Sequence, residues 1–383
     1  MDRKKVLICV DWYEPGFKAG GPIKSVSHIV SALKDQFEFY ILTSAYDLGE
    51  TEPYDTVTTD VWMDQEGIFI KYLSKKNLKA GAIKGNIQEI DPDLIYLNSL
   101  FSKLFTLVPL RFAKRKKIGV ILAPRGMLGR GALEIKATKK KTFLALSKII
   151  GLYKKITWHA STTEEEQEVK AAFGSRSRVV VAQNIPVGQK LELDNILDRK
   201  ETGNIRYVFI SRVARKKNVH LAIECLKKCK TESNVYFDIY GNVEEQEYFD
   251  TFKDDLKDHG NVKIEYKGVL RPSEIAEVYA DADFMLLPTM HENYGHAIVE
   301  AWSNGCPVII STNTPWKNLN VQDLGWDVDI SDPDNLTAAI QESIDQDFTS
   351  YIAMVRASYN HFANQIVDDK VIADNESLFR NAN

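Results

Sequence analysis

The chain has 383 residues, of which 44% are hydrophobic and 27% are charged. These values are ordinary for a folded protein of two or three domains, and they exclude a disordered chain, a collagen-like fibre and a disulfide-stapled mini-protein. The apolar runs are only a few residues long, whereas a membrane-spanning helix needs about 20. The apolar stretch near the start of the sequence is also shorter than a signal peptide requires. The four cysteines lack zinc-site spacing, so we expect core thiols in a cytoplasmic protein.

The charge is divided unevenly along the chain. Residues 1–190 contain 30 Lys and Arg against 20 Asp and Glu, and the remaining residues contain 19 against 33. Residues 101–155 alone hold 15 basic residues and one acidic residue, mixed with apolar positions. That mixture predicts a segment that lies on an anionic membrane surface, with a solvated basic face as the alternative. No nucleic-acid partner is expected, because no recognised nucleic-acid module is visible.

The first half of the chain alternates short β-rich apolar runs with helical patterns. The predicted strands span residues 5–11, 37–43, 69–73, 94–98, 119–123, 156–160 and 179–182. Helical patterns lie between them, for example at residues 22–33 and 164–172. This alternation predicts an α/β domain over residues 1–185, with a parallel sheet and helices on both of its faces.

A polar stretch at residues 186–203 interrupts this pattern and predicts a linker. Strands are then expected at residues 205–210, 235–240, 262–266, 284–287 and 308–311, and helices at 219–228, 244–257, 272–279, 295–303 and 333–345. The second domain therefore spans residues 204–360, and residues 361–383 are expected to form a helix that packs back on the first domain. Two doubly wound domains that face an interdomain cleft would bind ligands there, at the carboxyl ends of their strands.

The most informative stretch is residues 287–309, LPTMHENYGHAIVEAWSNGCPVI. A buried strand ends, a loop follows, and a helix begins near Gly295, whose N-terminal N–H groups favour an anion. Glu292 lies in the loop, and Glu300 lies about 7.5 Å further along the helix. A carboxylate binds vicinal hydroxyls well, so a nucleoside diphosphate at the helix start would place its ribose near Glu300. The alternative for Glu300 alone is a solvated helix face.

Two further stretches suit an anionic ligand. FISRVARKKNV, residues 209–219, follows a strand and opens a helix, so Arg212 and Lys217 lie where they could neutralise a diphosphate. PGFKAGGPIKS, residues 15–25, follows the first strand, and Gly20 and Gly21 there would allow close backbone approach to an anion. The alternative for residues 209–219 is a solvated run of charges. The alternative for residues 15–25 is a turn that only begins the helix.

Together these stretches resemble the retaining glycosyltransferases of family four, which have two Rossmann-like domains in the GT-B fold. The resemblance covers nearly the whole chain and is strongest over residues 205–316. The signature of this family is two glutamates separated by seven residues, matched by Glu292 and Glu300, and its basic pair matches Arg212 and Lys217. HENYGHAIVEAWSNGCPVIIS, TPWKNL, YLNSLFS, APRGML and HASTTEEE are similar to a bacterial surface-polysaccharide branch.

The resemblance implies a role for each matching residue. Arg212 and Lys217 would bind the donor diphosphate, Glu300 the ribose, and Glu292 the donor sugar. Backbone contacts to sugar, phosphate and base would come from the residues Asn293, Tyr294, Gly295, Val269 and Leu270. Many members carry a His after the fifth strand of the first domain, where this chain has Arg125, which is therefore a candidate for a polar role there.

Two histidines are further candidates, since His296 opens the helix beside the predicted anion site and His159 follows a strand. Packing roles are the alternatives for both. Several Asp-x-Asp pairs occur, but they lie in turns or, like Asp281 and Asp283, before a strand, at the end away from the expected cleft. We therefore expect no metal ion and no cofactor.

These observations predict a metal-independent retaining glycosyltransferase that uses a nucleoside diphosphate sugar, most simply a UDP-sugar. The expected acceptor is a glycan, lipid-linked and held at the inner face of the cytoplasmic membrane, as in lipopolysaccharide or capsule synthesis. A nucleotide-sugar epimerase on the same fold and a non-catalytic nucleotide- or glycan-binding protein are the alternatives.

Overall fold

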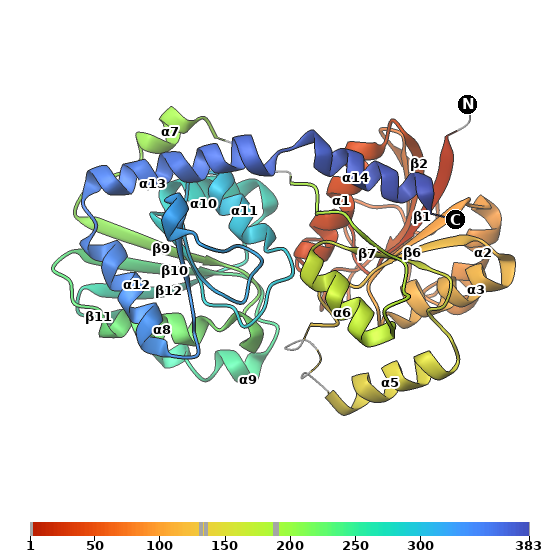
Figure 1. Ribbon diagram of the computed structural model, residues 1–383, viewed down its shortest axis with the longest axis horizontal. Coiled ribbons are helices and arrows are strands. Elements are labelled where there is room, and N and C mark those ends of the chain that lie inside the picture. The colour runs from red at the N-terminus through yellow and green to blue at the C-terminus, as the bar shows by residue number, and fades with distance from the viewer. Residues whose placement is uncertain (1–2, 130–132, 134–136, 187–190, 383) are drawn as a thin grey trace. The chain divides into compact units, whose positions relative to one another are not determined.

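The computed structural model describes the whole chain except residues 1–2, 130–132, 134–136, 187–190 and 383. The chain forms two compact units (Figure 1). The first consists of residues 1–185 together with 369–383, and the second of residues 186–368. Each unit has its own parallel-dominated sheet with flanking helices, so the predicted α/β class with two Rossmann-like units is confirmed.

Among its described residues, the first unit contains an eight-stranded sheet in which the edge strand β3 pairs antiparallel and the other pairs are parallel. In sheet order the strands are β3 (Trp62–Gln65), β4 (Ile68–Leu73), β2 (Phe37–Ser44), β1 (Lys4–Cys9), β5 (Leu94–Asn98), β6 (Gly119–Ala123), β7 (Thr157–Ala160) and β8 (Val179–Val181). The helices are α1 (Gly21–Leu33), α2 (Ala80–Ile90), η1 (Lys103–Leu107), α3 (Val108–Lys116), α5 (Ala137–Ile149), α6 (Thr163–Phe173) and α14 (Asp369–Asn381).

The C-terminal helix α14 completes the first unit. It lies beside α1 in Figure 1, and its Phe379 is fully buried among rings of the sheet. The Phe379 ring stacks on Tyr96 of β5, with ring centroids 5.3 Å apart. Lys4 of β1 donates hydrogen bonds to the carbonyl oxygens of Phe379 and Ala382, both at 3.0 Å. The end of the chain is therefore part of the core of this unit.

The second unit repeats the architecture, again with only its edge strand β11 antiparallel within the described residues. In sheet order its strands are β11 (Asp258–His259), β12 (Val262–Gly268), β10 (Asn234–Tyr240), β9 (Asn204–Ile210), β13 (Phe284–Leu287), β14 (Val308–Ser311) and β15 (Gly325–Val328). Its helices are α7 (Leu193–Leu197), η2 (Arg215–Lys217), α8 (Val219–Lys228), α9 (Gln246–Phe249), η3 (Lys253–Asp255), η4 (Pro272–Glu274), α10 (Ile275–Asp281), α11 (His296–Ser303), η5 (Asn320–Gln322), α12 (Pro333–Asp345), α13 (Phe348–His361) and η6 (Phe362–Ile366).

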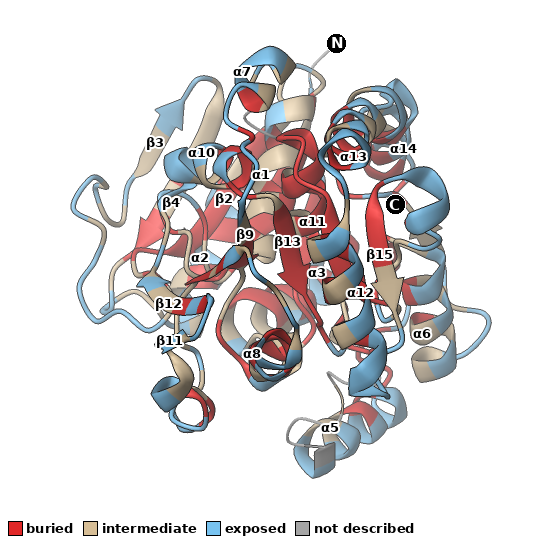
Figure 2. Cartoon of the chain, turned by 90° about the vertical axis from the view of Figure 1, so that its left-hand side faces the viewer, coloured by how far each residue is buried: buried red, intermediate tan, exposed pale blue. Residues whose placement is uncertain are grey.

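The central strand β13 shows why a strand of the second unit can appear in the sequence as a continuous apolar run. All four of its residues, FMLL, are buried, because helices cover both faces of a parallel sheet. Figure 2 shows β13 in the colour of buried residues. A strand of this kind appears as a continuous apolar run rather than an alternating one, and it ends in the loop that carries Glu292.

Several segments differ from the sequence predictions. Residues 361–383 do not form one helix, since α13 and η6 of the second unit end at His361 and Ile366 and only α14 belongs to the first unit. The predicted helix over residues 244–257 is wrong, since only α9 and the single turn η3 form there. Tyr248 and Phe252 are instead drawn into the core, with their ring centroids 5.3 Å apart, and this packing replaces a continuous helix. Within the polar stretch 186–203, α7 forms and buries Ile196 in the core of the second unit; residues 187–190 lie outside the described residues. The edge strands β3, β11 and β15 were not predicted.

None of the described helices combines the length and the apolar character that crossing a bilayer requires. The four cysteines are free thiols, and three of them, Cys9, Cys225 and Cys306, are buried.

Candidate active site

The candidate site of the second unit lies where two neighbouring parallel strands end. β9 leads into the basic loop before α8, and β13 leads into the loop before α11. The Met290 backbone N–H of the second loop donates to the Lys216 carbonyl oxygen of the first at 2.8 Å. Because the carboxyl ends of parallel strands share one edge of the sheet, two segments that are 75 residues apart in sequence become neighbours.

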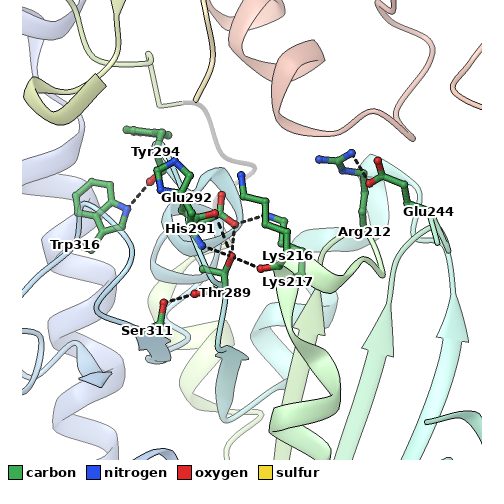
Figure 3. Close-up of polar contacts among 10 residues, drawn as sticks. All are labelled: Arg212, Lys216, Lys217, Glu244, Thr289, His291, Glu292, Tyr294, Ser311 and Trp316. Atoms are coloured by element: carbon green, nitrogen blue, oxygen red, sulfur yellow. Dashed lines mark hydrogen bonds and ion pairs between the residues drawn. The ribbon is translucent and has the colours of Figure 1, made fainter. Parts of the chain in front are cut away.

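Lys217 and Glu292 form the central contact of this site (Figure 3). The Lys217 ammonium donates a hydrogen bond to the Glu292 carboxylate, and their side chains are only 13% and 12% exposed. The buried Thr289 hydroxyl lies 3.3 Å from the same carboxylate oxygen. The site therefore brings together the two predicted residues of opposite charge in a place that is largely shielded from water.

The charge state of Glu292 follows from competing effects. Burial on its own raises the pKa of this carboxyl, but the Lys217 and Lys216 ammonium groups and the hydrogen bond from Lys217 outweigh burial. The pKa of Glu292 therefore lies below its ordinary value, and the side chain is ionised at neutral pH.

The start of α11 is held by its glycine and by Trp316. Gly295 precedes the helix with φ of 82°, a left-handed conformation, and a Cβ there would lie 2.8 Å from the Ile298 side chain. The Trp316 indole N–H donates to the Tyr294 carbonyl oxygen at 2.6 Å. The helix N-terminus, with its N–H groups and positive dipole end, is thereby fixed immediately after Glu292.

Arg212 lies in the same basic loop but belongs to a different ion pair, with Glu244 at 2.6 Å (Figure 3). Its side chain is 35% exposed and that of Glu244 is 41% exposed. The loop is held by a parallel bridge between Val213 and Val243. Gly241, with φ of 144°, makes this approach possible, because a Cβ there would lie 1.8 Å from the Ser211 carbonyl oxygen.

The other predicted donor-site residues of the second unit lie on α11 and in the loops after β12 and β13. Glu300 lies on α11, half-buried, and its backbone oxygen accepts from Ser303 at 2.8 Å. His296 opens the helix, with its ring centroid 5.0 Å from that of Tyr294. The exposed Val269 and the partly buried Leu270 and Asn293 lie in the loops after β12 and β13.

Arg125 is at the carboxyl edge of the sheet of the first unit. Its guanidinium donates to the Asn98 side-chain oxygen at 2.8 Å, to the Tyr96 hydroxyl at 2.6 Å, and to the Asn184 side-chain oxygen. Arg125 has φ of 53°, so the turn after β6 holds it in a left-handed conformation. It thus joins the ends of three strands, β5, β6 and β8.

His159 does not lie where a ligand could contact it. It is fully buried, and burial together with the nearby Arg125 lowers its pKa to about 3. The neutral ring therefore carries one proton, which the Nε2 atom donates to the Ala182 carbonyl oxygen at 2.9 Å, while Nδ1 accepts from the Tyr96 hydroxyl at 2.9 Å. The suggested ligand contact of His159 is replaced by a packing role.

Gly20 and Gly21 open α1 in the first unit. Gly20 has φ of 67°, and a Cβ there would meet nothing within 4 Å, so the glycine is needed for the backbone conformation rather than for space. Pro22 follows near the start of the helix, as the sequence predicts.

The Asp281 and Asp283 pair has structural partners. Asp281 pairs with Arg199 at 2.9 Å, and Asp283 accepts from the Arg206 backbone N–H at 2.7 Å and from the Tyr351 hydroxyl at 2.8 Å. Both lie before β13, at the end of the strand opposite Glu292. Over the described part of the chain, no group of three or more His, Cys, Asp or Glu side chains is arranged to hold a metal ion.

Comparison with known proteins connects this geometry to a family. Residues 192–361 match the family of glycosyl transferases group 1, and this range includes every donor-site residue predicted in the second unit. O-antigen chain mannosyltransferase B of Escherichia coli is 33% identical over 93 residues, which are 24% of each chain, so the match spans about a quarter of that relative. The predicted resemblance to glycosyltransferases is thus supported over residues 192–361, which lie in the second unit.

Solved structures share the fold across the whole chain. HepE of Anabaena, solved with UDP-glucose, has a TM-score of 0.74 and 17% identity, covering 98% of each chain. Sucrose-phosphate synthase of Thermosynechococcus elongatus has a TM-score of 0.73 and 15% identity, covering 99% of this chain and 98% of that one. WaaG, a glycosyltransferase involved in lipopolysaccharide biosynthesis, has a TM-score of 0.68 and 12% identity, covering 98% and 100%. The fold is GT-B, as predicted.

The sequence did not point to three residues of this site. Thr289 directly follows the Leu-Pro end of β13, which is a position that could have drawn attention to it. Trp316 lies in TPWKNL, which resembled the family, but no role was assigned to it. Glu244 belongs to an acidic run without a motif, so its pairing with Arg212 becomes visible only in three dimensions.

The Lys217–Glu292 pair predicts a pH-dependent stability. Glu292→Gln keeps the shape of the side chain but leaves the Lys217 ammonium buried without its carboxylate. Breaking a buried pair costs about 3–5 kcal/mol, and we expect the lower end in urea unfolding at pH 7. Because the pKa of Glu292 is lowered in the folded state, this stabilisation is present above its ordinary pKa of 4.5 and is lost as the pH falls through the lower folded-state pKa.

The matched control is Glu245→Gln, which removes the surface partner of Arg215. These side chains are 37% and 60% exposed, so the loss should stay below about 1 kcal/mol. If the destabilisation by Glu292→Gln did not exceed that of the control at pH 7, or did not shrink in acid, the pair would not stabilise the fold.

Proposed function

We propose that this chain, which carries the glycosyl transferases group 1 domain on a GT-B fold, transfers a sugar from a nucleoside diphosphate donor, a UDP-sugar, to a glycan. The transfer retains the configuration of the anomeric carbon and needs no metal ion. The observation that carries the proposal is the shielded Lys217–Glu292 contact immediately before the N-terminus of α11. A cation for the diphosphate and a carboxylate for the sugar lie side by side there.

The leaving diphosphate sets the main electrostatic requirement of the reaction. As the bond between the sugar and the diphosphate breaks, negative charge grows on the phosphate oxygens. Lys217, Arg212 and the N–H groups at the start of α11 would stabilise that charge with groups that are already in place. The ion pairs with Glu292 and Glu244 hold both cations in position beforehand.

Positive charge develops on the sugar ring at the same time. Glu292 is ionised, so its carboxylate would stabilise an oxocarbenium-like transition state if the sugar lies beside it. Glu300 lies further along α11, where it would bind the ribose hydroxyls of the donor. UDP-glucose in HepE, a protein of the same fold, supports the choice of a UDP-sugar as the first donor to test.

The acceptor belongs to cell-surface polysaccharide synthesis in this proposal. The named roles of O-antigen chain mannosyltransferase B and WaaG support a surface glycan such as lipopolysaccharide. A lipid-linked acceptor would require the enzyme to work at the inner face of the cytoplasmic membrane. The basic residues within 101–155 are the part of the chain that we propose to lie on that anionic surface.

The first experiment tests the diphosphate contacts. A panel of UDP-sugars is screened by thermal shift and then by sugar transfer and donor hydrolysis, with EDTA in excess.

Lys217→Ala or Arg212→Ala removes a charge-assisted contact worth about 1.5–3 kcal/mol, so donor use should fall roughly tenfold to more than a hundredfold. The shift in melting temperature on adding UDP should shrink in the same variants.

The control for these variants is Lys253→Ala, which changes an exposed lysine paired with Asp250 at 3.0 Å. It should leave donor use unchanged. Wild-type turnover in Lys217→Ala and Arg212→Ala would overturn the assignment of the diphosphate contacts, and loss of activity in EDTA would overturn metal independence. An isomerised donor without any acceptor would indicate an epimerase instead.

The two glutamates should differ in their kinetic effects. Glu300→Gln should mainly raise KM, because ribose contacts change little during the reaction. Glu292→Gln should mainly lower kcat, because its contact strengthens as positive charge develops on the sugar. Steady-state kinetics with a single donor and acceptor pair distinguish them, and the reverse pattern would mean that the sugar lies elsewhere relative to α11.

Membrane association is tested with vesicles of anionic phosphatidylglycerol and of neutral phosphatidylcholine. Binding should favour the anionic vesicles and weaken in 1 M salt, where the Debye length is about 3 Å. Charge reversal to Glu at Lys139, Lys140 and Lys141 should reduce binding, whereas reversal at the exposed Lys75 and Lys76 should change it little. Equal binding to both kinds of vesicle would favour the solvated basic face.

A further inference from the structure

The first unit contains a cavity of about 690 Å³ that the donor site does not involve. Residues 147–158 and 173–178 contribute its lining. These segments include the end of α5, the amino end of β7 and the turn between α6 and β8. The cavity is thus at the amino ends of the strands, the edge of the sheet opposite Arg125, where doubly wound folds do not place their usual ligand.

The lining of this cavity is strongly basic. It includes five cationic residues and no acidic one: Lys148, Lys154, Lys155, Arg176 and Arg178. Within the described part of the chain none of the five forms an ion pair, although Arg178 donates a hydrogen bond to the Asn381 carbonyl oxygen at 2.7 Å, and all five are exposed. Several unpaired cations around one hollow produce a positive potential that attracts anions.

The positive charge near the cavity also affects the pKa of Lys114, a neighbouring residue. Its ammonium donates to the carbonyl oxygens of Gly151 and Leu152 at 2.6 and 2.9 Å, beneath the turn that precedes β7. Its pKa is lowered, first by burial and then by the charges of Lys154 and Lys155. The charges of Lys154 and Lys155 thus act on Lys114, and a bound anion near them would offset that effect.

Thr157 provides an independent observation. It lines the cavity, is 2% exposed, and its buried hydroxyl has no hydrogen-bond partner within the described part of the chain. A buried hydroxyl without a partner costs about 1–3 kcal/mol. The hydroxyl itself has almost no accessible surface, so a ligand oxygen that enters beside Thr157 would accept its hydrogen bond after a small shift of the lining. The lysines and arginines there are donors only.

The aromatic residues of the lining are committed to packing. The rings of Trp158 and Phe173 stack with centroids 4.7 Å apart, and the Tyr153 hydroxyl donates to the Leu100 carbonyl oxygen at 2.9 Å. They form a rigid wall and are not free to stack on a nucleotide base. The recognition that the cavity offers is therefore for charge and oxygen atoms.

We propose that this cavity binds a phosphate group, separately from the donor diphosphate. Guanidinium groups match phosphate geometry, ammonium groups add charge, and the Thr157 hydroxyl supplies a directed hydrogen bond. The volume exceeds that of one phosphate, so the ligand is a phosphate ester with room for its substituent. The phosphate could come from a soluble ester or from a lipid head group, and the inference does not depend on the proposed transfer reaction.

Exposed apolar residues at the end of α5 indicate which source of phosphate suits the cavity. Leu146, Ile149 and Ile150 are 56%, 79% and 64% exposed, next to the lining residues Ser147 and Lys148. Figure 2 shows α5 largely in the colour of exposed residues. Apolar side chains beside a phosphate pocket suit a lipid whose head group enters the cavity while its chains remain in the bilayer.

The test measures hydrogen–deuterium exchange of the full chain at residues 147–158 and 173–178. One arm adds inorganic phosphate and the other adds vesicles of phosphatidylglycerol in phosphatidylcholine. We expect exchange to slow in these two segments. Slowing by phosphate alone indicates a soluble ester. Slowing only by the anionic vesicles indicates a lipid head group if Thr157→Val reduces it, whereas slowing that Thr157→Val leaves unchanged reflects adsorption of the basic residues 101–155 and would overturn the cavity site.

Substitutions in the lining test whether the slowed hydrogen–deuterium exchange depends on the cavity. Lys155→Gln with Arg176→Gln should weaken binding about a hundredfold, from roughly tenfold for each lost charged contact. Thr157→Val keeps the volume and should weaken binding about fivefold without lowering the melting temperature. The control pair Lys75→Gln and Lys76→Gln should have no effect, and Lys217→Ala, which alters the donor site, should retain the protection.

Three results would overturn the proposal. The first is unchanged exchange in both arms. The second is protection that the Lys155→Gln and Arg176→Gln variant keeps. The third is equal protection by vesicles of phosphatidylcholine alone. The first two would mean that the cations only offset the carbonyl ends of α5 and α6, and the third that the apolar residues at the end of α5 contact the bilayer without a phosphate site.

Discussion

The contact between Lys217 and Glu292 connects the two loops on which the candidate active site depends. One loop follows β9 and the other follows β13, so the pair joins segments that meet only because the strands are parallel neighbours. Two charges shielded to this degree are costly to separate, and each holds the other in a fixed place. Glu292 lies two residues before Tyr294, whose carbonyl oxygen accepts a hydrogen bond from Trp316, so the same loop also fixes the start of α11.

The same contact holds a cation and a carboxylate of the candidate site in fixed positions. In the proposed reaction, a donor diphosphate would share Lys217 with Glu292, whose carboxylate would face the sugar. Arg212 and Glu244 repeat this arrangement on the neighbouring loop with greater exposure. The cations need little reorganisation at the moment of reaction, which is the condition under which fixed charges stabilise a transition state well.

Much of the fold and part of the site could be predicted from the sequence. α8 and α12 have the predicted bounds, because their apolar periodicity and their start signals agree. The edge strand β3 lacked a buried face, and residues 244–257 look helical until Tyr248 and Phe252 are drawn into the core. Lys217 and Glu292 were found because each lies in a local motif, whereas Thr289 and Glu244 act through contacts between distant segments.

The cations of the two units differ in whether they have carboxylate partners, as the uneven charge of the chain suggests. In the second unit, which is acidic overall, the cations of the candidate active site have carboxylate partners, as Lys217 has in Glu292 and Arg212 in Glu244. In the first unit, the cations around Thr157 have no carboxylate partner within the described residues. A paired cation can exchange its carboxylate for a ligand that comes and goes, while a group of unpaired cations keeps its repulsion until an anion arrives. Under the two proposals, the regions would therefore take different anions, a donor that turns over in one and a phosphate that stays bound in the other.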